Sequence, residues 1–378
     1  MKKIYFDNAA TTAIDPEVVD VMTDYMRNHH GNPSSIHSFG REVRNAIEKA
    51  RKTVAQILKV TPSEVFFTSG GTEANNTAIF CSVRDLGVKH IISSSIEHHA
   101  VTHTVEELEK AGKVRVSWVR LDDKGRVDLG HLGELLESDD KTLVSLMHAN
   151  NEVGNLLPLK QVAEMCAEAG AFFHCDTVQT MGHYPLDLSS IPVHFVTCAA
   201  HKFHGPKGVG FLYIRHDVKI HPFIFGGAQE RNMRGGTENV YGIIGLAKAM
   251  EISNRDMDEH SRHIEGVKKY MAQRLMDEIP GIRFNGDCMG DSLYTVLNVA
   301  FPAGEQSEML LFNLDISGVA CSGGSACSSG SNAGSHVLRA IYGQENRPSV
   351  RFSFSKFNTK EEVDFTVERL KELYAVNA

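Results

Sequence analysis

The residue with the clearest chemical meaning in this sequence is a lysine, Lys202, at the end of a predicted strand. His201 precedes it, and a Gly-Pro-x-Gly turn over 205–208 follows it. A lysine held at a strand end, partly desolvated and near another cation, can lose its proton and attack a carbonyl carbon. Most lysines only make a protein surface soluble. Lys202 is therefore a candidate Schiff-base lysine only if the other residues of a carbonyl-cofactor site are also present.

Four other polar segments, each soon after a predicted buried strand, are candidates for that site. They are Thr68–Asn76, Ile96–Ala100, His148–Gly154 and Asp176–Gln179. The first is a glycine-containing turn before a predicted helix, where free N–H groups and the helix dipole favour a phosphate, so Gly71 and Thr72 are candidate ligands. An ordinary capped helix start is the alternative interpretation of this turn.

The other three segments supply an aromatic ring, amides and a carboxylate. His98 can lie against an aromatic cofactor, and Asn151 is one of two adjacent amides; a surface histidine and a simple turn are the alternatives. Asp176, at the end of a buried strand, needs a partner because an unpaired buried charge is costly, unless it only caps a helix. In a pyridoxal phosphate (PLP) site that partner is the pyridine nitrogen, and Gln179 lies within reach of the phenolic oxygen.

Alternating helix and strand patterns over the first two-thirds of the chain must position these segments, and they predict a mainly parallel α/β sheet flanked by helices. Ligands of such sheets bind beyond the carboxyl ends of the strands, so all five elements together predict a PLP site. Buried strands are predicted at Glu64–Thr68, His90–Ser94, Thr142–Met147, Ala171–Asp176, His194–Thr197 and Val209–Ile214. Apolar residues at helical spacing predict helices over Glu42–Val60, Thr104–Ala111 and Leu159–Ala169.

After about Gly245 the pattern changes to that of a smaller α+β region. One long charged helical run, Ala247–Glu278, is expected to bridge to it. Further elements are predicted near Ile282–Phe284, Leu293–Val299 and Val350–Phe354 as strands, and near Glu308–Leu314 and Thr359–Leu373 as helices. We therefore expect a large cofactor-binding domain over 15–250 and a small domain formed by 1–14 and 251–378, with a glycine- and serine-rich loop at about 321–335.

The composition is that of an ordinary globular protein and argues against several functional classes. Hydrophobic residues make up 42% of the 378 residues and the formal net charge is −8, with no basic stretch typical of nucleic-acid binding. Neither a membrane-spanning run nor a signal peptide is expected. The 7 cysteines form no C-x-x-C pair, which favours a reducing cytoplasm, and the 19 histidines lack the spacing of a metallohydrolase.

These motifs resemble those of the class V aminotransferase superfamily of PLP enzymes, and more closely those of the group I cysteine desulfurases of iron–sulfur cluster assembly. The resemblance covers nearly the whole chain. It rests on the segments above and on Tyr5–Thr12, Gly31–Ser35, Arg234–Thr237, Cys321–Ser329 and Val350–Phe354. It implies a fold-type-I PLP-dependent transferase with a smaller α+β C-terminal domain.

The resemblance assigns cofactor-binding roles to the candidate residues. Lys202 would bind PLP as a Schiff base, while Gly71, Thr72 and His201 would hold its phosphate. Thr237 would reach the phosphate of the neighbouring subunit, which implies a homodimer.

Further roles follow for the ring and the substrate. His98 would stack on the ring and manage protons on the substrate thiol, and Asp176 would pair with the pyridine nitrogen. Gln179 and Asn151 would lie near the phenolic oxygen, with Asn151 also close to the substrate. Arg351 would form a bidentate pair with the substrate α-carboxylate, a geometry that suits a guanidinium.

The resemblance also implies the reaction, in which L-cysteine becomes L-alanine and its sulfur passes to Cys327 as a persulfide. A thiolate nucleophile must be accessible, and Cys327 lies among serines and glycines. An iron–sulfur scaffold or another sulfur-acceptor protein would then take the sulfur. Cys327 is also a candidate transient iron–sulfur ligand, no other metal ligand is assigned, and Cys321 is interpreted as structural.

One position departs from the family pattern, and two alternatives stay open. Ala199 stands where relatives carry a hydroxyl, and a missing bond to the phosphate costs about 1.5–3 kcal/mol unless a neighbouring hydroxyl or a water replaces it. The first alternative is a selenocysteine lyase or another class V lyase or aminotransferase, although a plain aminotransferase needs no thiol. The second is a non-catalytic sulfur carrier or scaffold, against which Lys202, Asp176 and Cys327 argue.

Overall fold

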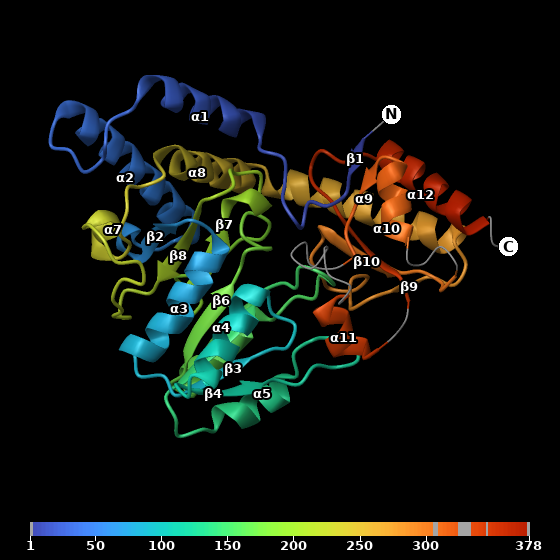
Figure 1. Cartoon of the computed structure of the whole chain (residues 1–378), viewed down its shortest axis with the longest axis horizontal. Coiled ribbons are helices and arrows are strands. Elements are labelled where there is room, and N and C mark those ends of the chain that lie inside the picture. Colours follow the sequence, from blue (N-terminus) through green and yellow to red (C-terminus); the bar gives the residue numbers. More distant parts are fainter. Residues whose placement is uncertain (1–2, 305–308, 324–333, 345–346, 376–378) are drawn as a thin grey trace.

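A seven-stranded sheet between two layers of helices forms the larger part of the protein, and a three-stranded sheet with its own helices lies beside it (Figure 1). The computed structural model describes residues 3–304, 309–323, 334–344 and 347–375. The strands of the large sheet are β2 (Val65–Thr68), β3 (His90–Ser93), β4 (Arg115–Trp118), β5 (Thr142–Met147), β6 (Phe172–Asp176), β7 (Phe195–Ala199) and β8 (Gly210–Ile214). Their order across the sheet is β2-β8-β7-β6-β5-β3-β4.

The large sheet is mainly parallel, as predicted. Strand β8 pairs antiparallel with β2 and β7, while the other pairs are parallel. Every residue of β5 is buried, and four of its six residues are apolar, as expected for a strand that is covered on both faces. Because β2, β3, β5, β6 and β7 run in the same direction, the segments that follow them meet at one edge of the sheet.

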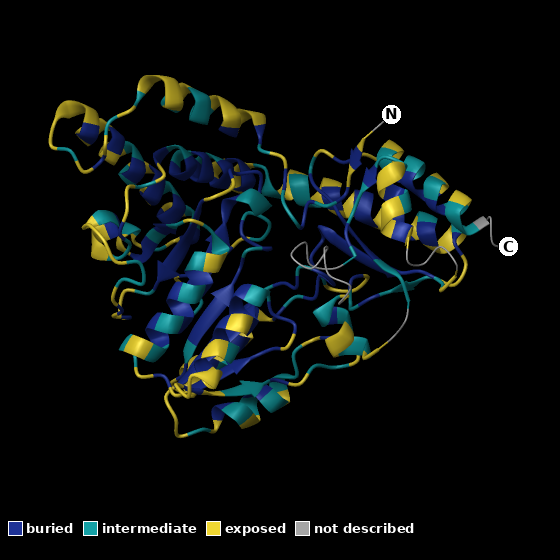
Figure 2. Cartoon of the chain, in the orientation of Figure 1, coloured by how far each residue is buried: buried dark blue, intermediate teal, exposed yellow. Residues whose placement is uncertain are grey.

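Helices cover both faces of this sheet. They are α1 (Pro16–Asn28), α2 (Ser38–Leu58), α3 (Gly71–Asp85), α4 (His99–Lys110), α5 (Leu129–Leu136), α6 (Leu159–Glu168) and α8 (Val240–Arg255). Apolar side chains of α2, α5, α6 and α8 pack on one face, and those of α3 and α4 pack on the other. Figure 2 shows the buried residues concentrated between these layers.

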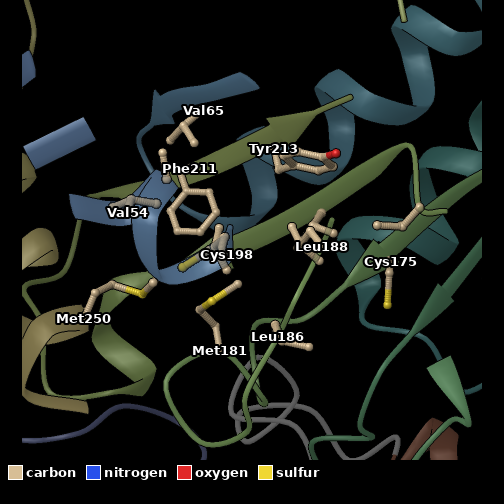
Figure 3. Packing of buried hydrophobic residues seen from close by; sticks show 14 of the residues in the cluster. Val54, Val65, Cys175, Met181, Leu186, Leu188, Cys198, Phe211, Tyr213 and Met250 are labelled. Carbon is tan, nitrogen blue, oxygen red and sulfur yellow. The ribbon is translucent and has the colours of Figure 1, made fainter. Parts of the chain in front are cut away.

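Figure 3 shows the core between the sheet and the helices α2 and α8. Phe211 and Cys198 of the sheet belong to the same cluster as Val54 of α2 and Met250 of α8, and all four are at most 1% exposed. Burial raises the pKa of the Cys198 thiol well above its usual range, so this cysteine is a packing residue. Cys81, Cys166, Cys175 and Cys288 are likewise buried free thiols.

A second core lies around the smaller sheet. Its elements are β1 (Ile4–Tyr5), β9 (Arg283–Phe284), β10 (Val296–Ala300), β11 (Val319–Ala320), β12 (Ser349–Ser353), α9 (Met257–Glu278), α10 (Leu310–Ile316) and α12 (Lys360–Ala375). Strand β10 lies between β12 and β9, and β1 pairs with β11, so the N-terminal segment belongs to this core. The domain boundaries near residues 14 and 250 stay a prediction.

Helix α11 (His336–Tyr342) packs away from this second core although it belongs to the same part of the sequence. Its Val337 is buried against Ile96 and Val153, which follow β3 and β5. The chain therefore returns to the edge of the large sheet directly after the segment 324–333.

The predicted single helix Ala247–Glu278 was wrong, because the chain breaks at Asp256 between α8 and α9. Asp256 has φ −109° and ψ 15°, outside the helical region, and its carboxylate accepts hydrogen bonds from Arg255. A short polar side chain that bonds locally competes with helix continuation. Strand β4 was not predicted, because it is an edge strand whose four residues are all exposed or half-buried. The helices of the described ranges include none that is long and apolar enough to cross a membrane.

Candidate functional site

A cavity of about 260 Å³ opens where β5, β6 and β7 end. The structure gathers most of the predicted site residues around it. Its lining includes Gly71, Thr72, His98, Asn151, Asp176, Gln179, His201, Lys202 and Arg351. Ala9 and Ala10 of the N-terminal segment also line it.

Lys202 enters this cavity from a short 3₁₀ turn, Ala200–Lys202, directly after β7. Its Nζ donates to the carbonyl oxygen of Ala9 and, at 2.8 Å, to that of Ala10. These carbonyls hold the amine at the boundary between the two cores.

Asp176 is the last residue of β6 and is 6% exposed. Its Oδ2 accepts a hydrogen bond of 2.7 Å from Asn75 Nδ2, and its Oδ1 accepts one of 2.9 Å from the Val178 N–H. Asn75, which the sequence reasoning missed, is 1% exposed, and its Oδ1 has no hydrogen-bond partner in the structure. The available signal was its position four residues after Gly71 on the same helix, which places both on one face.

The backbone of the turn before α3 lacks side chains at Gly70 and Gly71, which allows other groups to approach it closely. Gly70 has φ 148° and ψ −172°, a conformation essentially restricted to glycine. A Cβ on Gly71 would lie 2.9 Å from Val178 Cγ2, so a side chain would crowd the wall of the cavity. Gly71 and Thr72 also line the cavity, so the N-terminus of α3 adjoins space that an anion can occupy.

His201 and Ala199 lie beside this turn. Burial, with smaller effects of Lys202 and Lys207, lowers the pKa of His201 to about 4. The Nδ1 of His201 lies 3.2 Å from the hydroxyl of Thr11, whereas Ala199 is 2% exposed and offers no polar group. Thr11 thus places a hydroxyl beside His201.

His98 is the N-cap of α4 and is held in one tautomer. Its Nδ1 accepts a hydrogen bond of 3.1 Å from the Ala100 N–H, so this nitrogen carries no proton. Burial lowers the pKa of His98, and the Lys202 cation adds to this effect, although the Asp176 charge acts in the opposite direction. We therefore assign a neutral imidazole with its proton on Nε2.

Arg351 brings a buried positive charge to the lining of the cavity. It is 1% exposed, and it donates to Asp7 Oδ1 at 2.9 Å and to the Asn151 carbonyl at 2.8 Å. Its Nε has no hydrogen-bond partner in the structure. Asp7, which the sequence reasoning also missed, accepts a further bond of 2.9 Å from the Ser322 hydroxyl. The guanidinium can therefore bind a second anion.

Two predicted site residues are not among the residues that line this cavity. Thr237 does not line this cavity; it lines a separate one of about 210 Å³ together with Ser69 and Gly208. Cys327 lies outside the described residues. Ser322, before the segment 324–333, bonds Asp7, and Ser335, after it, bonds Glu152. Within the described ranges no cluster of three or more His, Cys, Asp or Glu side chains is suited to a metal ion.

Glu97, directly before His98, is a buried carboxyl whose protonation we expect to control stability. It is 1% exposed, one oxygen accepts a 2.8 Å bond from the Ser94 hydroxyl, and the other has no partner in the structure. Burial raises the pKa of Glu97 to about 8 from its usual 4.5. The protonated Glu97 carboxyl therefore stabilises the fold fully below pH 4.5, and this stabilisation is lost as the pH rises through about 8.

Replacing Glu97 by glutamine should remove this dependence, because the amide keeps the shape and cannot ionise. As the pH rises from 4.5 to 8, the wild type should lose stability relative to Glu97→Gln. The difference in the free energy of unfolding, variant minus wild type, should therefore increase by at most about 1.4 kcal/mol per pH unit. Urea unfolding at several pH values measures it, with the exposed Glu107→Gln as the control. Parallel pH profiles of Glu97→Gln and wild type would contradict this assignment.

Comparisons with known proteins agree with this geometry. Residues 4–365 match the family described as Aminotransferase class-V. A cysteine desulfurase IscS of Dictyoglomus turgidum (strain DSM 6724 / Z-1310) is 42% identical, with 98% of this chain and 94% of that protein covered. Among solved structures, a NifS-like protein has a TM-score of 0.91 at 38% identity, covering 99% of this chain and 100% of its own. SspA in complex with cysteine has a TM-score of 0.82 at 29% identity, covering 95% and 100%. The chain therefore belongs to the class V aminotransferase family and, within it, to the cysteine desulfurases.

Proposed function

We propose that this enzyme uses PLP to convert L-cysteine to L-alanine and passes the sulfur to Cys327 as a persulfide. An acceptor protein of iron–sulfur cluster or other thio-cofactor assembly would then receive the sulfur. The observation that carries the proposal is the single cavity that joins the Lys202 amine, the Asp176 carboxylate and the Arg351 guanidinium. The similar fold of SspA, which was solved with cysteine, supports the substrate.

The cavity residues fit PLP from one end to the other. The N–H groups of Gly71 and Thr72, together with His201, would hold the phosphate, and Asp176 would pair with the pyridine nitrogen. The missing Cβ at Gly71 and the 2.7 Å bond that orients Asp176 support this fit. When bound, PLP withdraws electrons from the α-carbon of an attached amino acid.

The chain's own residues would bind the substrate and move its protons. Arg351 would bind the α-carboxylate with the guanidinium face that Asp7 and Asn151 leave available. Lys202 Nζ would remove the α-proton, and His98 Nε2 would exchange a proton with the thiol.

In net terms, one sulfur atom would move from L-cysteine to the Cys327 thiol, and no outside oxidant or reductant would be needed. The Cys327 thiolate would attack the substrate sulfur, so that an S–S bond forms while the Cβ–S bond breaks. The electron pair of the broken bond would stay on the three-carbon fragment, and a proton would take the place of sulfur on Cβ. The products would be alanine and one persulfide on Cys327.

Mapping the sulfur by mass spectrometry tests this function. After incubation with L-cysteine and alkylation, we expect one extra sulfur on Cys327, with one alanine formed per persulfide in the first turnover. The buried thiols and Cys321 should stay unmodified, because burial raises the pKa values of Cys321 and Cys198 and a thiolate is the nucleophile. Sulfur on Cys321, or alanine without persulfide, would overturn the assignment of Cys327.

A further inference from the structure

The turn before Thr237 has an unusual backbone. Three consecutive residues, Glu230, Arg231 and Asn232, have φ values of 44°, 56° and 65°. Residues with a Cβ adopt this left-handed conformation rarely, and then usually singly. The segment α7 (Gln229–Asn232) is therefore a strained turn rather than an α-helix, and such strain persists only where the surroundings enforce it.

A buried ion pair holds the first residue of this turn. Arg51 of α2 binds the Glu230 carboxylate with two hydrogen bonds of 2.8 Å, and the two residues are 1% and 5% exposed. The same carboxylate accepts a 2.8 Å bond from the Phe67 N–H, and Arg51 also donates to the Val65 carbonyl at 2.7 Å. The turn is thus fixed to both α2 and β2.

A second ion pair holds the segment that follows. Arg234 binds Glu73 through Nε at 3.0 Å and Nη2 at 3.1 Å, and Glu73 directly follows Thr72 of the phosphate turn. Two glycines close the loop, since a Cβ on Gly235 would lie 2.6 Å from the Cα of Gly226. The two ion pairs therefore attach the segment that leads into Thr237 to α2, β2 and α3.

The position of Thr237 explains why this fixing is needed. The cavity that it lines shares Ser69 and Gly208 with an opening of about 370 Å³ on the outer side of the phosphate turn. The resemblance to the cysteine desulfurases implies that Thr237 reaches the phosphate of the neighbouring subunit, and a two-fold dimer across this opening would allow that contact at both sites. A residue that serves another subunit has no ligand in its own chain to guide it, so its own chain must position it beforehand.

We propose that the Arg51–Glu230 and Glu73–Arg234 ion pairs are positioning contacts that hold Thr237 where it binds the cofactor phosphate of the neighbouring subunit. The inference rests on the proposed function, because it needs PLP, and on the homodimer that the family resemblance implies. It predicts that damage to these contacts acts on the other subunit's site.

Mixed dimers separate this effect from a local loss of structure. One protomer carries Lys202→Ala, so borohydride reduction attaches cofactor only to Lys202 of the other protomer, and mass spectrometry counts that site alone. Glu230→Gln is then placed either in the Lys202→Ala protomer or in the counted protomer. PLP titration without cysteine measures the affinity of the counted site. With Glu230→Gln in the Lys202→Ala protomer, we expect about tenfold or more weaker binding, because a hydrogen bond to an ionised group is lost. With Glu230→Gln in the counted protomer, the affinity should change by less than about twofold.

Two further variants complete the test. Arg234→Gln, at a side chain that is 27% exposed, should reproduce the first result if Glu230→Gln does not fold. Lys59→Gln is the matched control, since Lys59 is also left-handed (φ 56°) but its ion pair with Asp187 is exposed. A larger loss in the protomer that carries the substitution would overturn the inference. A monomer in sedimentation would overturn it as well, and persulfide formation on Cys327 would report separately on the proposed function.

Discussion

Replacing Lys202 by alanine is expected to slow alanine formation from L-cysteine by roughly 10²–10⁴-fold, the usual contribution of a positioned acid–base group. Among the described residues that line the cavity, Lys202 is the only lysine, so no second amine can remove the α-proton. The loss should appear in kcat, because the contacts of Arg351 with the substrate carboxylate are not altered.

Single-turnover assays of alanine and persulfide together measure this effect. A small primary amine added to Lys202→Ala should restore part of the rate, since it can enter the vacated space and carry the proton. The matched control is Lys219→Ala, at an exposed lysine beyond β8. Alanine formation at the wild-type rate in Lys202→Ala would contradict the role of this amine.

The part of the site that the sequence predicted consists of residues directly after strong strand patterns. Buried-strand patterns such as that of β5 placed the strand ends within two residues. The parallel strands β5, β6 and β7 bring Asp176 and Lys202 to one edge, and β2, which pairs with β8, brings Gly71 to the same edge. The comparisons confirmed the family and the enzyme class that these residues indicated.

The residues that were missed act through partners far away in the sequence. Asn75 and Asp176 are 101 positions apart, and Asp7 and Arg351 are 344 positions apart. Neither pair leaves a local pattern, because a hydrogen bond between distant segments is set by how the elements pack in the folded chain. The strained turn at Glu230 was missed for the same reason, since Arg51 enforces it from another helix.

Replacing Arg351 by glutamine is expected to lower kcat/KM for L-cysteine by about 10²-fold or more. Two hydrogen bonds between ionised groups contribute about 1.5–3 kcal/mol each, and glutamine cannot form the bidentate pair. The effect should fall mainly on KM, because Lys202 and Asp176 keep their own contacts. Unchanged KM would rule out Arg351 as the carboxylate ligand.

Stability and substrate binding can be separated at this position, because Arg351 also neutralises Asp7. Arg351→Gln leaves the Asp7 carboxylate, which is 20% exposed, with the Ser322 hydroxyl, so the free energy of unfolding should fall by about 1–3 kcal/mol. The double variant Arg351→Gln/Asp7→Asn removes both charges, so urea unfolding should show recovered stability while KM stays high. Arg347→Gln is the control, since Arg347 donates to the carbonyls of Phe301 and Gly281. A double variant that regained a normal KM would show that Arg351 acts on the fold alone, whereas recovery of stability without affinity would identify it as the residue that binds the carboxylate.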